Sequence, residues 1–477
     1  MANSLISNLF WKFAEQTSSQ FVSFVISVIL ARLLAPADYG VIAMVAIFVS
    51  LTKVMVDGGL NSALIQKKDA DMVDFSTVLY FTLGLSALFY LILFLGAPYV
   101  SAFYGKDYEI LIPVLRVLGL QIFIYAFNSV QQAYVARKMM FKKFFWATLI
   151  GTIASGVIGI VLAYTGFGVW ALVAQILTSA IANTIVLYAI TKFLPRTNFS
   201  IERLKSLINY GYKVFGSSLL VVIFQEIRAL IIGKVYSPSD LAFYDRGRQY
   251  PNLVVANANT SIGAVLFPKL ALSQDNLEKV KQTTRNSIRV SSYILCPMLV
   301  LLAISAEPFV RLLLTDKWLP CVPLLQLFCV AYFFQPIHTA NMQAIKAIGR
   351  SDILFKLELI KKTIEILSLL AVMWISVTAI VISLAVTTTF FTFINSYPNK
   401  KLLNYTYLEQ LKDMMSPCVL SMIMAVPLIL SFLFIKNDLT LIIVQVIIGI
   451  ITYILLSILS NNKEFSFIWQ TIRNIKK

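Results

Sequence analysis

Long apolar segments follow one another along almost the whole chain, separated by short polar stretches. A helix needs about 20 apolar residues to cross the hydrocarbon core of a bilayer. No segment shows the alternating pattern of a membrane β-barrel, so the predicted fold is an all-α polytopic membrane protein. The pattern predicts about fourteen transmembrane helices, at 11–31, 40–56, 75–100, 110–134, 146–164, 169–191, 211–233, 243–267, 288–314, 319–345, 353–374, 376–396, 415–435 and 439–460.

Two patterns of polar residues occur twice, in the same order, between these apolar segments. Pro113-Val-Leu-Arg-Val-Leu is followed 210 residues later by Pro323-Leu-Leu-Gln-Leu-Phe. A basic residue, a proline and an aspartate also recur at a constant spacing of 202 residues, as Arg32, Pro36 and Asp38 and then as Lys234, Pro238 and Asp240. A parallel duplication of membrane helices is typical of transporters whose two halves move around a central site.

The duplication predicts a domain organisation. We expect two pseudo-symmetric six-helix bundles, at 1–192 and 210–396. The basic segment 193–209 between them is predicted to be an amphipathic linker on the cytoplasmic surface. Residues 397–477 hold two further helices without a counterpart in the repeat, followed by a cytoplasmic tail. The first apolar segment lacks the small-residue cleavage site of a signal peptide, so we expect it to remain as a helix.

The repeated proline and aspartate predict a structural turn in each half. Proline presets its own φ and disfavours helix in the residue before it, so Pro36 and Pro238 should end one helix and begin the next. Asp38 and Asp240 lie two residues further on, where a carboxylate can cap the new helix. We therefore expect these four residues to serve folding rather than substrate contact.

Charge is sparse and unevenly distributed. Only 13% of the residues are charged, the mean hydropathy is +0.80 and the net charge is +17. Roughly 25 of the 40 lysines and arginines fall in loops that we place in the cytoplasm, and about 6 in the opposite loops. This asymmetry predicts that both termini are cytoplasmic, and it accounts for the basic excess without a nucleic-acid partner.

Enzyme chemistry has no support in the chain. We find no nucleophile–base set, no phosphate-binding glycine loop and no dinucleotide fingerprint. The four cysteines do not have the spacing of metal ligands, so we expect neither a metal nor a cofactor.

Several segments resemble one family. Leu30-Ala-Arg-Leu-Leu-Ala-Pro-Ala-Asp-Tyr-Gly40 resembles the first turn of bacterial polysaccharide flippases of the Wzx type. The segments 58–66, 168–173 and 231–236 resemble the same family, in the same order and across both halves. Where the family often has a glycine before the tyrosine of the eighth helix, this chain has Ala242-Phe-Tyr244. The resemblance implies the superfamily shared with multidrug and toxin extrusion proteins and the lipid II flippase, with two six-helix bundles and alternating access.

The resemblance also implies a substrate and a location. The substrate would be an undecaprenyl-diphosphate-linked oligosaccharide repeat unit, turned from the inner to the outer leaflet of the bacterial cytoplasmic (inner) membrane. The product would be capsule, O-antigen of lipopolysaccharide, exopolysaccharide or teichuronic acid. The partners would be membrane lipids, a polysaccharide polymerase and chain-length machinery. The alternative is a cation-coupled multidrug exporter of the same fold, which would need acidic residues in its cavity, whereas the deep charges here are mostly basic.

A lipid diphosphate requires cations in a wet cavity, because an ionised group at membrane depth is costly unless it is paired. The candidates within the predicted spans are Lys53, Arg116, Lys213, Arg228, Arg246 and Arg248. Arginine suits this role best, because its planar guanidinium group can bind phosphate oxygens with two hydrogen bonds. Arg228 is our first choice, because it lies deep in its span and Glu226 is about 200° around the same helix, where the two cannot pair.

Each of the other candidates also has a structural interpretation. Lys53 could pair with Asp57 four residues later, and Lys213 and Arg116 could extend to the membrane surfaces. The span 243–267 carries a polar stripe that begins at Arg246 and should face a cavity or another helix, unless this segment is a short interfacial loop followed by a buried helix. In that stripe Arg246 and Arg248 could instead cap the outer end of the span.

Acidic residues and one histidine are candidates for ion coupling. They are Glu15, Glu226 and His338, the only histidine of the chain. A single histidine in a helix more often makes an ordinary hydrogen bond than a proton relay. On the span 353–374 the spacing predicts two i,i+4 ion pairs, Glu358–Lys362 and Lys361–Glu365.

The asymmetry of lysine and arginine makes a topological prediction. A cysteine introduced at position 142 should be cytoplasmic and one at position 106 should face outward. An impermeant thiol reagent applied to intact cells should therefore label position 106 and leave position 142 unlabelled until the membrane is permeabilised. Labelling of position 142 alone would show that the orientation is inverted.

Overall fold

The computed structural model describes residues 2–105, 107–195, 198–272, 276–462 and 464–466, and within them the regular elements are helices. The predicted all-α membrane fold is confirmed. Eleven of the described helices are long and apolar enough to cross a bilayer. Three more predicted spans correspond to α1, α10 and α15, and α15 carries ion pairs that reduce its apolar character. Lys106 and the terminal lysines of the predicted tail lie outside the described residues.

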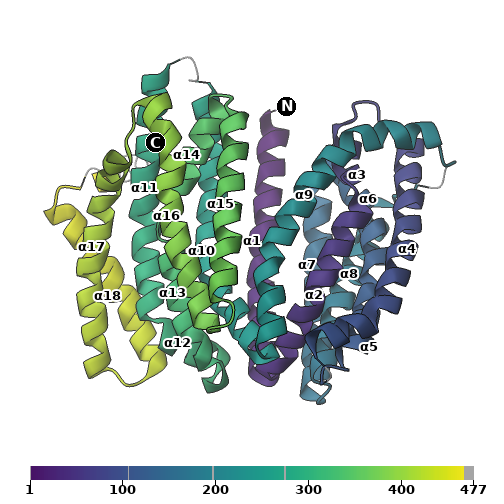
Figure 1. Cartoon of the computed structure of the whole chain (residues 1–477), viewed down its shortest axis with the longest axis horizontal. Coiled ribbons are helices and arrows are strands. Elements are labelled where there is room, and N and C mark those ends of the chain that lie inside the picture. The colour runs from purple at the N-terminus through teal and green to yellow at the C-terminus, as the bar shows by residue number, and fades with distance from the viewer. Residues whose placement is uncertain (1, 106, 196–197, 273–275, 463, 467–477) are drawn as a thin grey trace. The chain divides into compact units, whose positions relative to one another are not determined.

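The chain folds into two compact units, Met1–Ala242 and Phe243–Lys477 (Figure 1). Unit 1 contains α1 (Ala2–Leu33), α2 (Pro36–Asp57), α3 (Leu60–Gln66), α4 (Met72–Tyr104), α5 (Leu111–Gly119), α6 (Gln121–Arg137), α7 (Phe141–Tyr164), α8 (Val169–Thr191) and α9 (Ile201–Val235). The helix α10 (Pro238–Ala271) begins in unit 1 and continues into unit 2. Unit 2 continues with α11 (Leu277–Ile304), α12 (Ala306–Leu314), the 3₁₀ helix η1 (Asp316–Cys321), α13 (Val322–Tyr332), α14 (Gln335–Ala347), α15 (Ser351–Val372), α16 (Val377–Leu403), α17 (Tyr407–Phe434) and α18 (Asp438–Leu459).

The boundary between the compact units lies after α9, whereas the sequence pattern places a linker at 193–209. Residues 201–209 of that segment form the first turns of α9 rather than a separate linker. The helix α9 packs against α2, α3 and α4, and Figure 1 shows it running beside α2. These contacts are the reason that α9 belongs to the first compact unit.

Both repeated turns have the expected capping geometry. Pro36 is the first residue of α2, and Asp38 Oδ2 accepts a hydrogen bond from the Ala35 backbone N–H at 3.0 Å. Asp240 Oδ2 accepts from the Ser237 backbone N–H at 3.1 Å and from its hydroxyl at 2.7 Å. In each turn the carboxylate therefore satisfies a backbone donor that the new helix leaves without a partner.

The two repeated turns also touch each other through their backbones. A methyl group added at Gly40 would lie 1.8 Å from the carbonyl oxygen of Pro238. A second close approach involves the first half of α9, because a methyl group at Gly59 would lie 2.2 Å from the carbonyl oxygen of Gly211. Only glycine allows backbones to come this close. At these two points, in α2 and just before α3, the backbone thus meets the start of α10 and α9 without an intervening side chain.

The caps predict the behaviour of aspartate variants. Asp38→Ala and Asp240→Ala should each remove about 1 kcal/mol of stability, and should lower the amount of folded protein more than the transport rate per molecule. Asp38→Asn and Asp240→Asn keep an acceptor oxygen and should stay close to the original protein in thermal unfolding of the purified protein. Normal protein levels with abolished transport would instead place these carboxylates in the mechanism.

The contact between Gly40 and Pro238 predicts a sharp difference between two glycine variants. Gly40→Ala must displace backbone and should lower the melting temperature and yield of the purified protein. Gly84 lies in α4 with open space around its Cα, so Gly84→Ala should be neutral or stabilise the helix by up to about 1 kcal/mol. Equal melting temperatures for the two variants would contradict the close approach.

Candidate functional site

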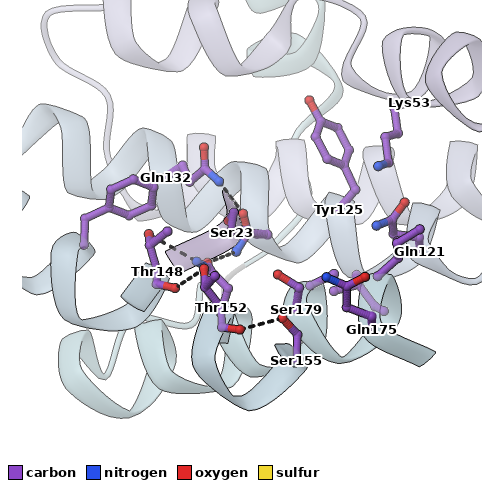
Figure 2. Close-up of a pocket in the computed structure, with 16 residues that line it drawn as sticks. Ser23, Lys53, Gln121, Tyr125, Gln132, Thr148, Thr152, Ser155, Gln175 and Ser179 are labelled. Atoms are coloured by element: carbon purple, nitrogen blue, oxygen red, sulfur yellow. Dashed lines mark hydrogen bonds between the residues drawn. The ribbon is translucent and has the colours of Figure 1, made fainter. Parts of the chain in front are cut away.

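A cavity of about 460 Å³ lies within unit 1, between α1, α2, α6, α7 and α8 (Figure 2). Two apolar side chains on α8, one on α6 and an aromatic ring on α7 contribute to its wall, but uncharged polar side chains dominate. These polar side chains are Ser23, Gln121, Tyr125, Asn128, Gln132, Thr148, Thr152, Ser155, Gln175, Ser179 and Asn183. We call this space the unit 1 cavity.

Helical spacing places these side chains on the inner faces of three successive helices. On α6 the polar positions follow one another at intervals of three or four residues, from Gln121 to Gln132. The same intervals separate the polar residues of α7, from Thr148 to Ser155, and those of α8, from Gln175 to Asn183. Residues at these intervals share one face of a helix. This pattern was the available signal for the site, and our sequence analysis, which followed charges, missed it.

A hydrogen-bond network joins the three helices at one side of the cavity. Asn128 Nδ2 donates to Asn183 Oδ1 at 2.9 Å and to Thr184 Oγ1 at 3.1 Å. Asn183 Nδ2 donates in turn to Thr148 Oγ1 at 3.3 Å, and Gln132 donates to Asn128. Amides that are paired with one another across helices in this way hold their positions, so this part of the wall is preorganised.

The hydroxyl groups of α7 face the cavity mainly as acceptors. Thr152 donates its hydroxyl hydrogen to the Thr148 carbonyl at 2.8 Å, and Ser155 donates to the Thr152 carbonyl at 2.8 Å. A hydroxyl that donates to its own helix still has lone pairs available. This arrangement suits a ligand that brings many hydroxyl donors of its own.

Lys53 is the one charged side chain among the described residues that line the unit 1 cavity. Figure 2 shows it beside Gln121, on the side of the cavity away from Thr148. The predicted pairing with Asp57 does not form. Asp57 ends α2, where its carboxylate accepts from the Gly59 N–H at 3.2 Å and from the Tyr125 hydroxyl at 3.3 Å. The Lys53 ammonium makes no hydrogen bond or ion pair to a described residue.

The predicted polar helix is continuous, which excludes the interfacial-loop interpretation. Arg246 lies in the third turn of α10, so it does not cap the helix end. It is 7% exposed, donates to Gln249 Oε1 at 2.7 Å, and its guanidinium lies 5.4 Å from the centre of the Trp318 ring. Arg248 forms an ion pair with Asp245 at 3.4 Å. These contacts favour packing and helix pairing as the roles of both arginines.

The remaining basic candidates separate into one buried and two peripheral residues. Arg228, on α9, is only 8% exposed and stays a candidate for a functional charge. Arg116 donates to the Phe94 carbonyl at 3.2 Å and lies 4.1 Å from the centre of that ring. Lys213 is exposed, and its ammonium lies 5.8 Å from the centre of the Tyr212 ring.

The candidates for ion coupling are dispersed. Glu15 is buried and forms an ion pair with Lys12 at 2.8 Å, whereas Glu226 is half-buried on α9. His338 Nδ1 accepts from Asn395 Nδ2 at 2.7 Å, and its Nε2 lies 3.1 Å from the Thr388 carbonyl oxygen. This pairing fits a neutral ring with the proton on Nε2, which is the ordinary structural use of a buried histidine.

His338 lines a second cavity, of about 420 Å³, which lies within unit 2 between α14, α15 and α16. We call it the unit 2 cavity.

The predicted i,i+4 ion pairs of α15 are wrong in their partners. The lysine of each pair bonds the glutamate three residues away, Lys361 with Glu358 at 2.6 Å and Lys362 with Glu365 at 2.8 Å. Residues three and four positions apart are both neighbours on a helix, so the sequence alone does not decide which glutamate each lysine binds.

Comparison with known proteins identifies relatives along most of the chain. Residues 29–323 match the model of a family described as polysaccharide biosynthesis protein. The succinoglycan biosynthesis transport protein ExoT of Rhizobium meliloti (strain 1021) is 27% identical over 76% of this chain and 72% of that protein. The lipopolysaccharide biosynthesis protein WzxC of Escherichia coli (strain K12) is 21% identical over 70% of this chain and 68% of that protein.

Among solved structures, the lipid II flippase MurJ in an inward closed conformation has a similar fold. The TM-score is 0.77 at 15% sequence identity, and the match covers 95% of this chain and 99% of that one. At this level of identity the likeness concerns the fold alone. It agrees with the fold that the sequence resemblance implies.

Proposed function

Because the chain belongs to the family of polysaccharide biosynthesis proteins, we propose that it is a flippase for an undecaprenyl-diphosphate-linked oligosaccharide, acting in the bacterial cytoplasmic membrane. The cargo would move from the inner to the outer leaflet by alternating access, for export of a polysaccharide. Two relatives carry names from succinoglycan transport and lipopolysaccharide biosynthesis, which supports this class of cargo.

The observation that carries the proposal is the composition of the unit 1 cavity. An oligosaccharide presents many hydroxyl groups that must exchange water for other hydrogen-bond partners when they enter a membrane protein. The wall offers amides and hydroxyl oxygens as these partners, together with the ring of Tyr125. Polar groups fixed by their own network give orientation without a net charge. Such a wall favours a neutral polyhydroxylated ligand over a drug-like apolar cation.

Lys53 supplies the positive charge that a lipid diphosphate requires. Its ammonium has three N–H donors and no described partner, in a cavity without an acidic lining residue. A charge without a partner inside a cavity is costly until an anion arrives. We propose that Lys53 contacts the diphosphate while the amide and hydroxyl wall contacts the sugars. The same lysine would repel a cationic drug, which argues against the multidrug exporter.

Arg228 is the second residue that we propose for the anionic part of the cargo, because it is buried on a membrane helix. We give Arg246 a lower rank than the sequence suggested, since Trp318 and Gln249 already accommodate its guanidinium. For ion coupling Glu226 remains the candidate, since the contacts of Glu15 and His338 favour structural roles.

The proposal predicts that charge at Lys53 and Arg228 is required for transport. Loss of one charge-assisted contact should cost roughly 1.5–3 kcal/mol of binding, or about ten- to a hundredfold in affinity. Lys53→Gln and Arg228→Gln should insert normally yet fail to complement a strain that lacks its flippase. Lys53→Arg and Arg228→Lys should retain partial activity.

The matched control is Lys205→Gln, which removes the same charge from an exposed position near the start of α9 and should complement fully. Reconstituted vesicles with a fluorescent undecaprenyl-diphosphate-linked oligosaccharide would measure the flipping rate of each variant directly. Full complementation by both glutamine variants at ordinary expression would refute the cationic contact and revive the drug-exporter interpretation.

A further inference from the structure

The unit 2 cavity occupies the second copy of the helices that form the unit 1 cavity. Helices α14, α15 and α16 follow one another in unit 2 as α6, α7 and α8 do in unit 1. Thr339 and Gln343 line the unit 2 cavity, each 211 residues after Asn128 and Gln132 of the unit 1 cavity. The duplication has therefore preserved a polar space at the same place in each copy.

The two cavities differ in charge. In unit 1 the middle helix lines the cavity with two threonines and a serine, whereas in unit 2 the middle helix α15 lines it with two glutamates and two lysines. Charged residues at membrane depth are expensive and usually mark a path for a ligand or an ion. The difference indicates that the unit 2 cavity has a ligand of its own, with a charged group.

Lys361 has unused donors in this cavity. Its side chain is 12% exposed, and its only described partner is Glu358, with Nζ at 2.6 Å from Oε1. An ammonium group has three N–H donors, so at least one more oxygen ligand can bind without breaking the pair. Glu358 is 46% exposed and can turn toward water if an incoming anion displaces it. The buried member of the pair is thus the cation.

Asn395 leaves an acceptor without a partner in the same cavity. Its Nδ2 donates to His338 Nδ1 at 2.7 Å, whereas its Oδ1 is buried and has no hydrogen bond to a described residue. His338 cannot supply the missing donor, because its other nitrogen lies against the Thr388 carbonyl. A buried amide oxygen of this kind can accept a hydrogen bond from an ordered water or from a hydroxyl or amine group of a ligand.

A ligand that satisfies both groups must bring a hydroxyl donor and an anionic oxygen. Resting on the proposed flippase function, we propose that the unit 2 cavity is a subsite for an acidic sugar residue, such as a hexuronic acid. Its carboxylate binds the Lys361 ammonium, and one of its hydroxyl groups donates to Asn395 Oδ1. The cavity of about 420 Å³ falls within the range of small-molecule pockets.

Two cargoes that differ in one group provide the test. Undecaprenyl-diphosphate-linked tetrasaccharides with one glucuronic acid residue, or with glucose in its place, would be flipped by the reconstituted full chain. Lys361→Gln should lower the ratio of two flipping rates, that of the acidic cargo over that of the neutral cargo, by roughly tenfold or more. This is the usual effect of losing a charge-assisted hydrogen bond. Lys361→Arg should restore most of that ratio.

Lys356→Gln is the matched control, because it removes the same charge from an exposed position on the same helix, and the ratio should not change. An unchanged ratio for Lys361→Gln would overturn the acidic subsite. A second outcome would also overturn it: loss of flipping in Glu358→Gln together with an unchanged flipping rate in Lys361→Gln. That result would indicate a cation site instead. Failure of the unmodified protein to flip either cargo would refute the proposed function itself.

A binding measurement keeps the test decisive if the Lys361 variants do not fold. The unmodified protein in lipid nanodiscs should bind the free tetrasaccharide that carries glucuronic acid more tightly than its glucose counterpart, by roughly tenfold at low salt. Asn395→Leu should weaken the binding of both saccharides to a similar degree, because it removes the acceptor of the sugar hydroxyl group. Equal affinities of the unmodified protein for the two saccharides would overturn the proposal.

Discussion

Polar groups inside a membrane must find partners, and this requirement organises the whole molecule. The backbone meets it by forming helices, and polar side chains meet it by bonding across helices, as Asn128 and Asn183 do. Arg246 meets it through Gln249 and the ring of Trp318. Where a cavity wall leaves such a group without a partner, as at Lys53 and at Asn395 Oδ1, a ligand is the natural way to complete the structure.

Features that depend on nearby residues could be predicted from the sequence. The length of apolar runs is enough to locate transmembrane helices, because spanning a bilayer is a matter of length and composition. The turns at Pro36 and Pro238 were predictable for the same reason, since a proline and an aspartate two residues later act within one turn. The family resemblance followed from ordered local motifs, and the family match along residues 29–323 confirms it.

Features that depend on distant residues could not be predicted. Asp57 was available to Lys53 by helical spacing, but the hydroxyl of Tyr125, 68 residues away in the sequence, binds its carboxylate together with the nearby Gly59 amide. The partner of Arg246 lies 72 residues away at Trp318, and no periodic pattern connects the two. The unit 1 cavity was overlooked for a different reason. Uncharged polar residues within apolar spans are individually unremarkable, and they become informative only when three helices bring them together.

The contact between Gly40 and Pro238, which both belong to unit 1, has a consequence for how its helices can change over evolutionary time. Surfaces that meet through interlocking side chains must change together, so each substitution limits the next. Here the meeting atoms belong to the backbone, which every substitution leaves in place except one at residue 40. The other side chains of α2 and of the start of α10 are consequently free to vary without disturbing this contact, as long as residue 40 remains glycine.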